Sequence, residues 1–234
     1  MTSRNSSWKS DFAAGASGPE AEEIKRTTEF GNRRGPIPLL PAGKDYLWGG
    51  RRLRDDFSKD IPLTPLAETW ECSTHPDGLS LLAEDPDKTL HELLQENPWM
   101  FGTHPAKSMP EAVEKGELPV LIKFIDAAAD LSVQVHPDDA YAREHENGQL
   151  GKSEMWYVVD AAPGAKLVYG FSHDMDRERV REAAQNGTLE KHLQRVPIRK
   201  DDVFFIPAGT VHAIGGGSLI AEVQESSNLT YRLY

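Results

Sequence analysis

The segment Leu131–His136, which reads LSVQVH, decides the fold prediction. Side chains of a β-strand alternate between two faces, so Ser132, Gln134 and His136 share one face and the apolar residues share the other. Polar side chains that point into a protein need partners, and inside a β-barrel a metal ion or a ligand can supply them. An exposed polar face of an amphipathic strand explains the same alternation, so this segment alone leaves both interpretations open.

Two later motifs favour the inward-facing interpretation. Glu154 follows His136 after 18 positions, which is enough chain for one helix and a return strand, and Lys152 shares the face of Glu154. Ile206–His212 reads IPAGTVH, in which proline and glycine predict a tight turn that presents His212 at the start of a strand. Each histidine taken singly is more often an ordinary core or surface residue, but the three motifs in this order indicate one site.

Short β-type runs between turn residues dominate the chain after residue 36. We predict strands at 120–125, 131–136, 155–159, 203–206 and 219–223. We predict helices at 89–96, 137–145 and 177–184. Apolar spacing marks the first helix, Pro137 and the two acids after it mark the second, and an Asn-Gly stop ends the third. The sequence therefore predicts a mainly β fold with inserted helices.

Composition limits the classes of function. The chain has 234 residues with 26 Lys and Arg against 37 Asp and Glu, a net charge of −11. This acidic balance argues against a nucleic-acid partner but allows a phosphorylated small molecule, which needs only a few local cations. No segment has the roughly 20 apolar residues of a membrane helix, so no membrane partner is expected. The single cysteine excludes an intrachain disulfide and a thiolate metal cluster and fits a cytoplasmic location.

Residues 1–35 differ from the rest of the chain, because Ser, Gly, Glu and Arg dominate and apolar residues are isolated. Such a stretch cannot bury enough surface to offset the entropy of ordering it. It also lacks the apolar run of a signal peptide. We therefore expect a disordered N-terminal extension at 1–35 and one domain at 36–234.

The motifs and their flanking residues resemble a known family. Gln-x-His, then Glu, then Pro-x-Gly-x-x-His is similar to the metal site of the cupin superfamily. Flanking segments are similar to type I mannose-6-phosphate isomerases at Tyr46–Gly50, Ala67–Glu71, His75–Pro76, Leu118–Ile125, Leu131–Asp139, Gly151–Tyr157, Ile206–Ile214 and Glu222–Arg232. The resemblance extends from about Pro36 to Tyr234.

The resemblance implies a cupin, or jelly-roll-like, β-barrel that acts as a zinc-dependent aldose–ketose isomerase on mannose 6-phosphate and fructose 6-phosphate. It implies one zinc ion per chain, held by Gln134, His136, Glu154 and His212. Imidazole nitrogen and carboxylate oxygen are ordinary zinc ligands, and a glutamine amide is a compatible but weaker one. Two neutral imidazoles, an amide and one carboxylate leave the centre positive, so it can stabilise a negative oxygen.

The resemblance also implies the other residues of the pocket. Moving a proton between C1 and C2 of an open-chain sugar phosphate needs a base, an electrophile at the oxygens and cations for the phosphate. Lys152, Lys123 and Glu222 are the implied catalytic residues, and Ser132, Lys152 and Glu68 the implied substrate contacts. A lysine beside a divalent cation can act as a base because the cation lowers its pKa. The alternative interpretations are a strand-edge lysine for Lys123 and a surface carboxylate for Glu68.

One departure from the family pattern keeps other functions open. In the family, the segment that here reaches Tyr234 continues into an Asp-x-x-Arg motif and a further β-domain, and Asn228 stands where many members carry Asp. We therefore expect the pocket arginine of that motif to be missing and the activity to be about 10- to 150-fold weaker. The alternative is a catalytically impaired zinc cupin that binds a sugar phosphate as a sensor or vestigial protein.

A third interpretation is a metal-dependent dioxygenase, whose sites favour three histidines and one glutamate, whereas Gln134 replaces a histidine here. The sequence gives no indication of the oligomeric state. The remaining histidines are interpreted as structural or exposed; they are His75, His91, His104, His145, His173 and His192.

Overall fold

The computed structural model describes residues 35–233, and the chain from Pro38 onward forms one compact unit. The extension expected at 1–35 lies outside the described residues apart from its last position, so its disorder stays a prediction. Among residues 35–233, no helix has the length and apolarity needed to cross a membrane.

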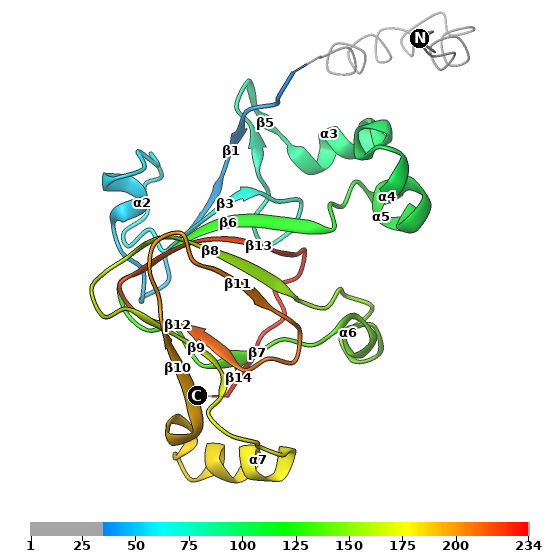
Figure 1. Ribbon diagram of the computed structural model, residues 1–234. Coiled ribbons are helices and arrows are strands. Elements are labelled where there is room, and N and C mark those ends of the chain that lie inside the picture. The colour runs from blue at the N-terminus through cyan, green and yellow to red at the C-terminus, as the bar shows by residue number, and fades with distance from the viewer. Residues whose placement is uncertain (1–34, 234) are drawn as a thin grey trace, which may run out of the picture. The chain divides into compact units, whose positions relative to one another are not determined.

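Two antiparallel sheets make up most of the fold (Figure 1). The six-stranded sheet has the order β11-β8-β13-β6-β3-β2, and the five-stranded sheet has the order β10-β9-β12-β7-β14. The larger sheet contains β2 (Ala42–Lys44), β3 (Glu68–Cys72), β6 (Val120–Ala127), β8 (Glu154–Ala161), β11 (Val203–Ile206) and β13 (Ser218–Glu225). The smaller contains β7 (Gln134–Val135), β9 (Lys166–Phe171), β10 (Leu193–Pro197), β12 (His212–Ile214) and β14 (Tyr231–Arg232). The mainly β prediction is confirmed.

A three-stranded sheet and short helices complete the fold. The small sheet has the order β1-β4-β5, with bounds Leu39–Leu40, Leu81–Leu82 and Asp85–Thr89. The helices are α2 (Arg52–Asp55), α3 (Leu90–Glu96), α4 (Thr103–Ser108), α5 (Pro110–Lys115), α6 (Asp139–His145) and α7 (Arg177–Gln185), with 3₁₀ turns η1 (Pro98–Phe101) and η2 (Leu189–His192). All three predicted helices are confirmed as α3, α6 and α7.

Side-chain caps explain where these three helices begin. Thr89 and Glu92 form a reciprocal capping box at α3. Asp138 caps α6 by accepting the Tyr141 N–H, and Asp176 caps α7 by accepting the Arg179 N–H. The predicted second helix therefore begins at 139, two residues later than the sequence indicated, because Asp138 is its cap.

The apolar core lies between the two large sheets. Ile125, Trp156, Val158 and Ile220 come from the six-stranded sheet, and Leu167 and Ile214 come from the five-stranded sheet. A second cluster covers the outer face of the five-stranded sheet, where Ala183 of α7 and Leu189 of η2 pack on Val168 and Ala213. The two sheets thus share one core, and α7 protects the far side of the smaller sheet.

Four predicted strands are confirmed as β6, β8, β11 and β13, but the strand predicted at 131–136 is reduced to Gln134–Val135. Its neighbours are the short strands β12 and β14, which provide few pairing partners. The strands form separate facing sheets, and within residues 35–233 hydrogen bonds do not close them into one continuous barrel.

Candidate metal centre and pocket

Three segments distant in sequence bring the predicted metal ligands together. Gln134 of β7 lies directly opposite His212 of β12 in the sheet register. His136 follows β7, and its carbonyl accepts the N–H of Gly209 at 2.8 Å, which ties the turn before His212 to this strand. Glu154 is the first residue of β8 in the facing sheet. The site therefore lies between the sheets.

The side chains converge closely. His136 Nε2 lies 3.1 Å from Glu154 Oε1, and His212 Nε2 lies 3.6 Å from Glu154 Oε2. Gln134 Nε2 lies 3.4 Å from His212 Nε2. His136, Glu154 and His212 each offer one possible ligand atom, and these three atoms lie within 4.8 Å of one another. All three are buried, with at most 2% of their surface exposed.

Backbone carbonyls orient both imidazole rings. His136 Nδ1 donates to the Leu229 carbonyl at 2.7 Å, and His212 Nδ1 donates to the Thr210 carbonyl at 2.8 Å. A carbonyl oxygen only accepts, so each Nδ1 carries the hydrogen and each neutral ring presents a lone pair on Nε2. Outer partners of this kind typically fix the tautomer of metal-binding histidines.

The charges of the donor set fit a divalent metal. Burial lowers the pKa of both His136 and His212, that of His212 to about 4, so both rings are neutral at neutral pH. Burial by itself raises the pKa of Glu154, but Lys152 and the two histidines outweigh it and hold that pKa well below its usual range. Lys152 Nζ forms an ion pair with Glu154 Oε1 at 2.5 Å, whereas Glu154 Oε2 is buried without a hydrogen-bond donor among the described residues. Two neutral nitrogens and an ionised carboxylate suit zinc.

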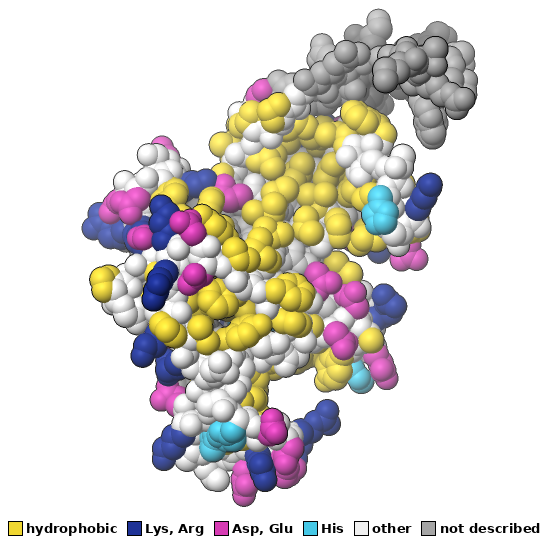
Figure 2. Space-filling view, in the orientation of Figure 1, with side chains coloured by type: hydrophobic (Ala, Val, Ile, Leu, Met, Phe, Trp, Pro, Cys, Tyr) yellow, Lys and Arg dark blue, Asp and Glu magenta, His cyan; other side chains and the backbone are white. Residues whose placement is uncertain are grey.

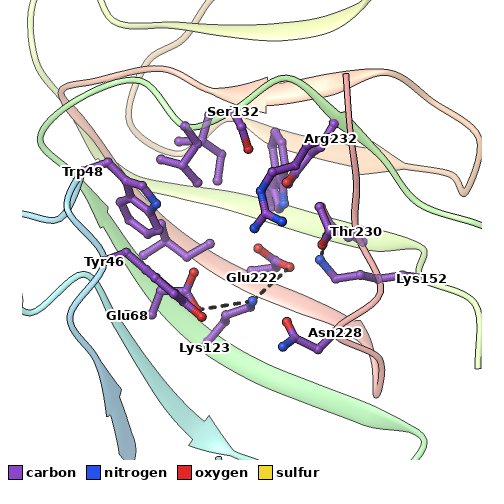
Figure 3. A pocket seen from close by; sticks show the side chains of 16 residues that line it. Tyr46, Trp48, Glu68, Lys123, Ser132, Lys152, Glu222, Asn228, Thr230 and Arg232 are labelled. Carbon is purple, nitrogen blue, oxygen red and sulfur yellow. Dashed lines mark hydrogen bonds and ion pairs between the residues drawn. The ribbon is translucent and has the colours of Figure 1, made fainter. Parts of the chain in front are cut away.

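A pocket opens beside this cluster (Figure 3). Gln134 and Glu154 of the predicted metal ligands line it, whereas His136 and His212 are not among its lining residues. The pocket also brings together every other site residue predicted from the sequence, namely Glu68, Lys123, Ser132, Lys152 and Glu222.

Lys123 sits between two buried carboxylates. Its Nζ lies 3.5 Å from Glu68 Oε2 and 3.9 Å from Glu222 Oε1, and all three side chains are nearly fully buried. Burial alone lowers the pKa of Lys123, but Glu222 and Glu68 outweigh it and raise that pKa. Trp70 Nε1 donates to Glu68 Oε2 at 2.7 Å and holds that carboxylate in place. The interpretations as a strand-edge lysine and a surface carboxylate are therefore wrong.

Glu222 is a pocket carboxyl group whose surroundings favour its neutral form. It lies in β13 opposite Lys123 of β6 and Trp156 of β8. Burial, followed by the charge of Glu154, raises the pKa of Glu222 to about 8, and Lys123 limits the rise. Its buried Oε1 has no hydrogen-bond partner within the described part of the chain. A carboxyl group in this state can hold or release a proton near neutral pH.

The segment before β8 is fastened to the body by its backbone. Gly151 N–H donates to Asp139 Oδ1 at 2.8 Å, Lys152 N–H to the Pro137 carbonyl at 2.9 Å, and Ser153 N–H to Glu225 Oε2 at 2.6 Å. A Cβ at position 151 would lie 2.5 Å from the α6 backbone, so only glycine fits there. These three backbone hydrogen bonds position the Lys152 side chain. Its Nζ lies 2.5 Å from Glu154 Oε1 and 3.1 Å from His136 Nε2.

Trp48, which the sequence assigned to the core or the pocket wall, lines the pocket, but the sequence analysis missed Tyr46, Asn228, Thr230 and Arg232. The arginine expected to be missing belongs to the Asp-x-x-Arg motif, and Arg232 is a different residue: it lines the pocket and its guanidinium points into the cavity (Figure 3). Arg232 has no ion-pair partner among residues 35–233. A detectable signal existed, because the last three residues of this set recur at every second position, as on one face of an extended strand.

Known proteins of one family are similar in sequence to this domain. A cupin-type pair of facing sheets holds a buried His/Glu cluster that could bind a metal ion. The family model for "Phosphomannose isomerase type I, catalytic domain" matches residues 37–160. The chain belongs to the type I phosphomannose isomerase family.

Individual relatives and a solved structure support the same family assignment. The chain is 40% identical over 201 residues to the probable mannose-6-phosphate isomerase GmuF of Bacillus subtilis (strain 168), covering 85% of this chain and 61% of that protein. It is 42% identical over 201 residues to mannose-6-phosphate isomerase of Streptococcus mutans, covering 85% and 60%. The crystal structure of mannose 6-phosphate isomerase from Bacillus subtilis matches with a TM-score of 0.77 at 39% identity, over 86% of this chain and 62% of that one. The chain thus spans about 60% of the length of these relatives, and the cupin-type fold prediction is confirmed.

Proposed function

We propose that this chain is a zinc-dependent aldose–ketose isomerase that interconverts mannose 6-phosphate and fructose 6-phosphate by proton transfer between C1 and C2. The observation that carries the proposal is the convergence of His136, Glu154 and His212 beside a pocket that holds Lys123 and Glu222. The relatives support the substrate, since they are named mannose-6-phosphate isomerase or probable mannose-6-phosphate isomerase.

Gln134, His136, Glu154 and His212 would hold one zinc ion. The nitrogen and oxygen of the Gln134 amide have nearly the same size, so the amide can rotate by half a turn and exchange them. The oxygen then faces the histidines and is the fourth ligand atom. When bound, zinc supplies a positive charge that stabilises negative charge on the sugar oxygens during proton transfer. The ionised carboxylate of Glu154, whose Oε2 has no hydrogen-bond donor among the described residues, and the fixed tautomers of both histidines support this assignment.

Glu222 is our candidate for the proton carrier between the two carbons. As a carboxylate it accepts the proton from C2 of the open-chain aldose, and as a carboxylic acid it returns that proton to C1. The hydroxyl proton moves from O2 to O1 at the same time, and Lys152 is the candidate donor at these oxygens. Burial, which together with the charge of Glu154 raises the pKa of Glu222 to about 8 in the metal-free chain, supports the role because it favours a carboxyl group that can take up and release a proton. Lys123 stays cationic because Glu222 and Glu68 raise its pKa, which favours binding over base catalysis.

Arg232 is our candidate for the phosphate partner. The pocket lysines are already paired, since Lys123 contacts Glu68 and Glu222 and Lys152 contacts Glu154. Arg232 points into the same cavity and has no such partner within the described residues (Figure 3). A guanidinium can bind phosphate oxygens with two parallel hydrogen bonds. The hydroxyl of Ser132 lines the cavity next to it and adds a neutral contact.

The alternative function, an impaired zinc cupin that only binds a sugar phosphate, rests on the absence of the Asp-x-x-Arg arginine and of the further β-domain. Arg232 is a different arginine, but it supplies a cation to the same pocket and so supports the proposed activity over the alternative.

A coupled assay of the full 234-residue chain tests the proposal. Metal-free protein is loaded with zinc and supplied with mannose 6-phosphate, and formation of fructose 6-phosphate is followed. We expect turnover that chelation abolishes and zinc restores, with no turnover of unphosphorylated mannose at the same concentration. Tight binding of mannose 6-phosphate without turnover would instead establish the binding-protein alternative.

A further inference from the structure

His173 and His192 form a second histidine pair at the end of strands β9 and β10. His173 Nε2 lies 3.1 Å from His192 Nδ1, and the two rings are 5.1 Å apart at an angle of 68°. His173 is exposed and His192 is half-buried. Figure 2 shows exposed histidine side chains beside α7, at the lower end of the molecule. The metal centre does not include this pair.

The backbone sets the position of both side chains. His173 follows β9, and His192 is the residue before β10. Phe171 and Leu193 are paired in the sheet register, and Ser172 N–H donates to the His192 carbonyl at 2.8 Å. The two imidazoles are therefore held as neighbours by the sheet ladder, and little freedom is lost when a ligand joins them.

Ser172 also determines which nitrogen of His173 carries the hydrogen. The Ser172 hydroxyl has one hydrogen, and it donates this to the His192 carbonyl at 3.1 Å. The contact of 3.1 Å between Ser172 Oγ and His173 Nδ1 must then be donated by the ring. Nδ1 of His173 is therefore protonated, and its Nε2 presents a lone pair toward His192 Nδ1.

We propose that His173 Nε2 and His192 Nδ1 form a surface binding site for one divalent transition-metal ion of the Ni²⁺, Cu²⁺ and Zn²⁺ group. With metal–nitrogen bonds of about 2.05 Å, two ligand nitrogens lie about 2.9 Å apart at a right angle and about 3.3 Å apart at the tetrahedral angle. The observed 3.1 Å falls between these values. His192 adopts the tautomer with Nε2 protonated on binding, and water completes the coordination.

The site differs in kind from the metal centre. It has two neutral nitrogen ligands and no carboxylate, and it faces solvent, so its ion exchanges readily. We therefore expect the chain to take up a second, easily removed ion when the metal is in excess. The proposal does not depend on the isomerase function, because neither histidine lines the pocket.

A Ni²⁺ titration of the zinc-loaded full chain tests the proposal, with calorimetry as the readout and elemental analysis to confirm that the central zinc is retained. We expect one Ni²⁺ per chain in the wild type, and binding at least about tenfold weaker in His173→Gln and in His192→Gln. His104→Gln is the matched control, because His104 is also exposed, and it should bind Ni²⁺ as the wild type does.

Ser172→Ala separates a built site from two chance neighbours. It leaves both ligands in place but removes the partner that fixes the His173 tautomer, and loss of such a partner typically costs about 10- to 100-fold in metal affinity. Unchanged Ni²⁺ affinity in either His173→Gln or His192→Gln would overturn the proposal and leave only a hydrogen-bonded histidine pair. Melting curves in chelator verify that all variants fold equally well.

Discussion

The two ends of the space between the sheets differ sharply, although the same strands build both. At one end Ile125 of β6, Val158 of β8 and Ile220 of β13 pack in an apolar core. Two positions away on the same inward face of β6 and β13, Lys123 lies next to Ile125 and Glu222 next to Ile220. The interior thus changes from apolar packing to buried charge between two successive inward-facing residue pairs of β6 and β13.

This difference separates stability from chemistry. Burying apolar surface favours folding, whereas buried ion pairs are often neutral or unfavourable compared with apolar residues of similar size. The charged end is also incompletely compensated, since Glu222 Oε1 and Glu154 Oε2 are buried without hydrogen-bond partners in the described region. We conclude that the apolar end provides the stability that allows the charged end to keep reactive protonation states.

The largest effect should come from Glu222→Gln. The amide keeps the shape of the side chain but cannot carry the proton between C1 and C2, and loss of a positioned acid–base group typically costs about 10²- to 10⁴-fold. Isomerase activity should fall by that factor while the zinc content stays unchanged. Glu71→Gln is the control, because Glu71 pairs with Lys59 outside the pocket. A loss of less than tenfold in Glu222→Gln would show that another group carries the proton.

Lys123→Met should be strongly destabilising. It leaves Glu68 and Glu222 without their shared cation, and breaking a buried pair in this way typically costs about 3–5 kcal/mol. Because about 1 kcal/mol shifts the melting temperature by about 2–4 °C for a chain of this size, we expect a fall of about 6–20 °C. The double variant Lys123→Met with Glu222→Gln should recover part of this loss, since one uncompensated carboxylate is removed.

Ile220→Ala is the matched change at the apolar end. It should cost about 2–5 kcal/mol through lost burial and a residual cavity, which is similar to the effect of Lys123→Met. Its turnover number at a temperature where the variant is folded should stay within about threefold of the wild type. Equal losses of turnover in the two variants would contradict the separation of the two ends.

Arg232→Ala should have a smaller effect on binding. Loss of a charge-assisted contact typically costs about 1.5–3 kcal/mol, which corresponds to about 10- to 150-fold in kcat/KM. The melting temperature should change little, because Arg232 is exposed. Arg181→Ala on α7 is the surface control. If kcat/KM for mannose 6-phosphate is unchanged in Arg232→Ala, the phosphate binds elsewhere in the pocket.

The smallest effect concerns pH and the stability of the metal-free protein. The pKa of Glu222 is about 8 in the folded chain against 4.5 as its ordinary value, so between these pH values the folded carboxyl retains a proton that the unfolded one releases. This contribution to stability is present at about pH 4.5 and is lost as the pH rises through about 8. The Glu222→Gln variant lacks this pH-dependent contribution to stability, because an amide does not titrate.

The measurement is the difference in melting temperature between the wild type and Glu222→Gln at pH 5.5 and at pH 8. The neighbouring charges of Lys123, Lys152, Glu68 and Glu154 are common to both proteins and largely cancel in the difference. The wild type should lose stability relative to the variant on going to pH 8, by up to several degrees. A difference that does not depend on pH would show that Glu222 is ionised in the folded chain.

The sequence predicted the charged end better than its surroundings, for a physical reason. Metal ligation requires particular side chains at particular spacings, and Gln134, His136, Glu154 and His212 all meet within one cluster. The partners that complete the pocket come from long-range pairing, since Arg232 reaches it because β14 pairs with β7. A two-residue strand has too little periodicity for its pairing to be predicted.

The sequence was least able to predict which individual side chains are buried. Lys123 and Glu68 each had a plausible surface interpretation, because a strand sequence does not show which sheet will cover it. The structure places β6 between β13 and β3, where its inward side chains have no access to solvent. Sequence likewise gave no reason to join His173 to His192, whose proximity follows from the pairing of β9 with β10.

Anomalous scattering at the zinc edge, from crystals of the full chain grown with one equivalent of zinc, tests the central claim most directly. We predict one strong peak within about 2.0–2.2 Å of His136 Nε2, His212 Nε2 and a Glu154 oxygen. Crystals of His212→Ala prepared in the same way should lack that peak. A wild-type map without density at this position, or with zinc only at His173 and His192, would contradict the account.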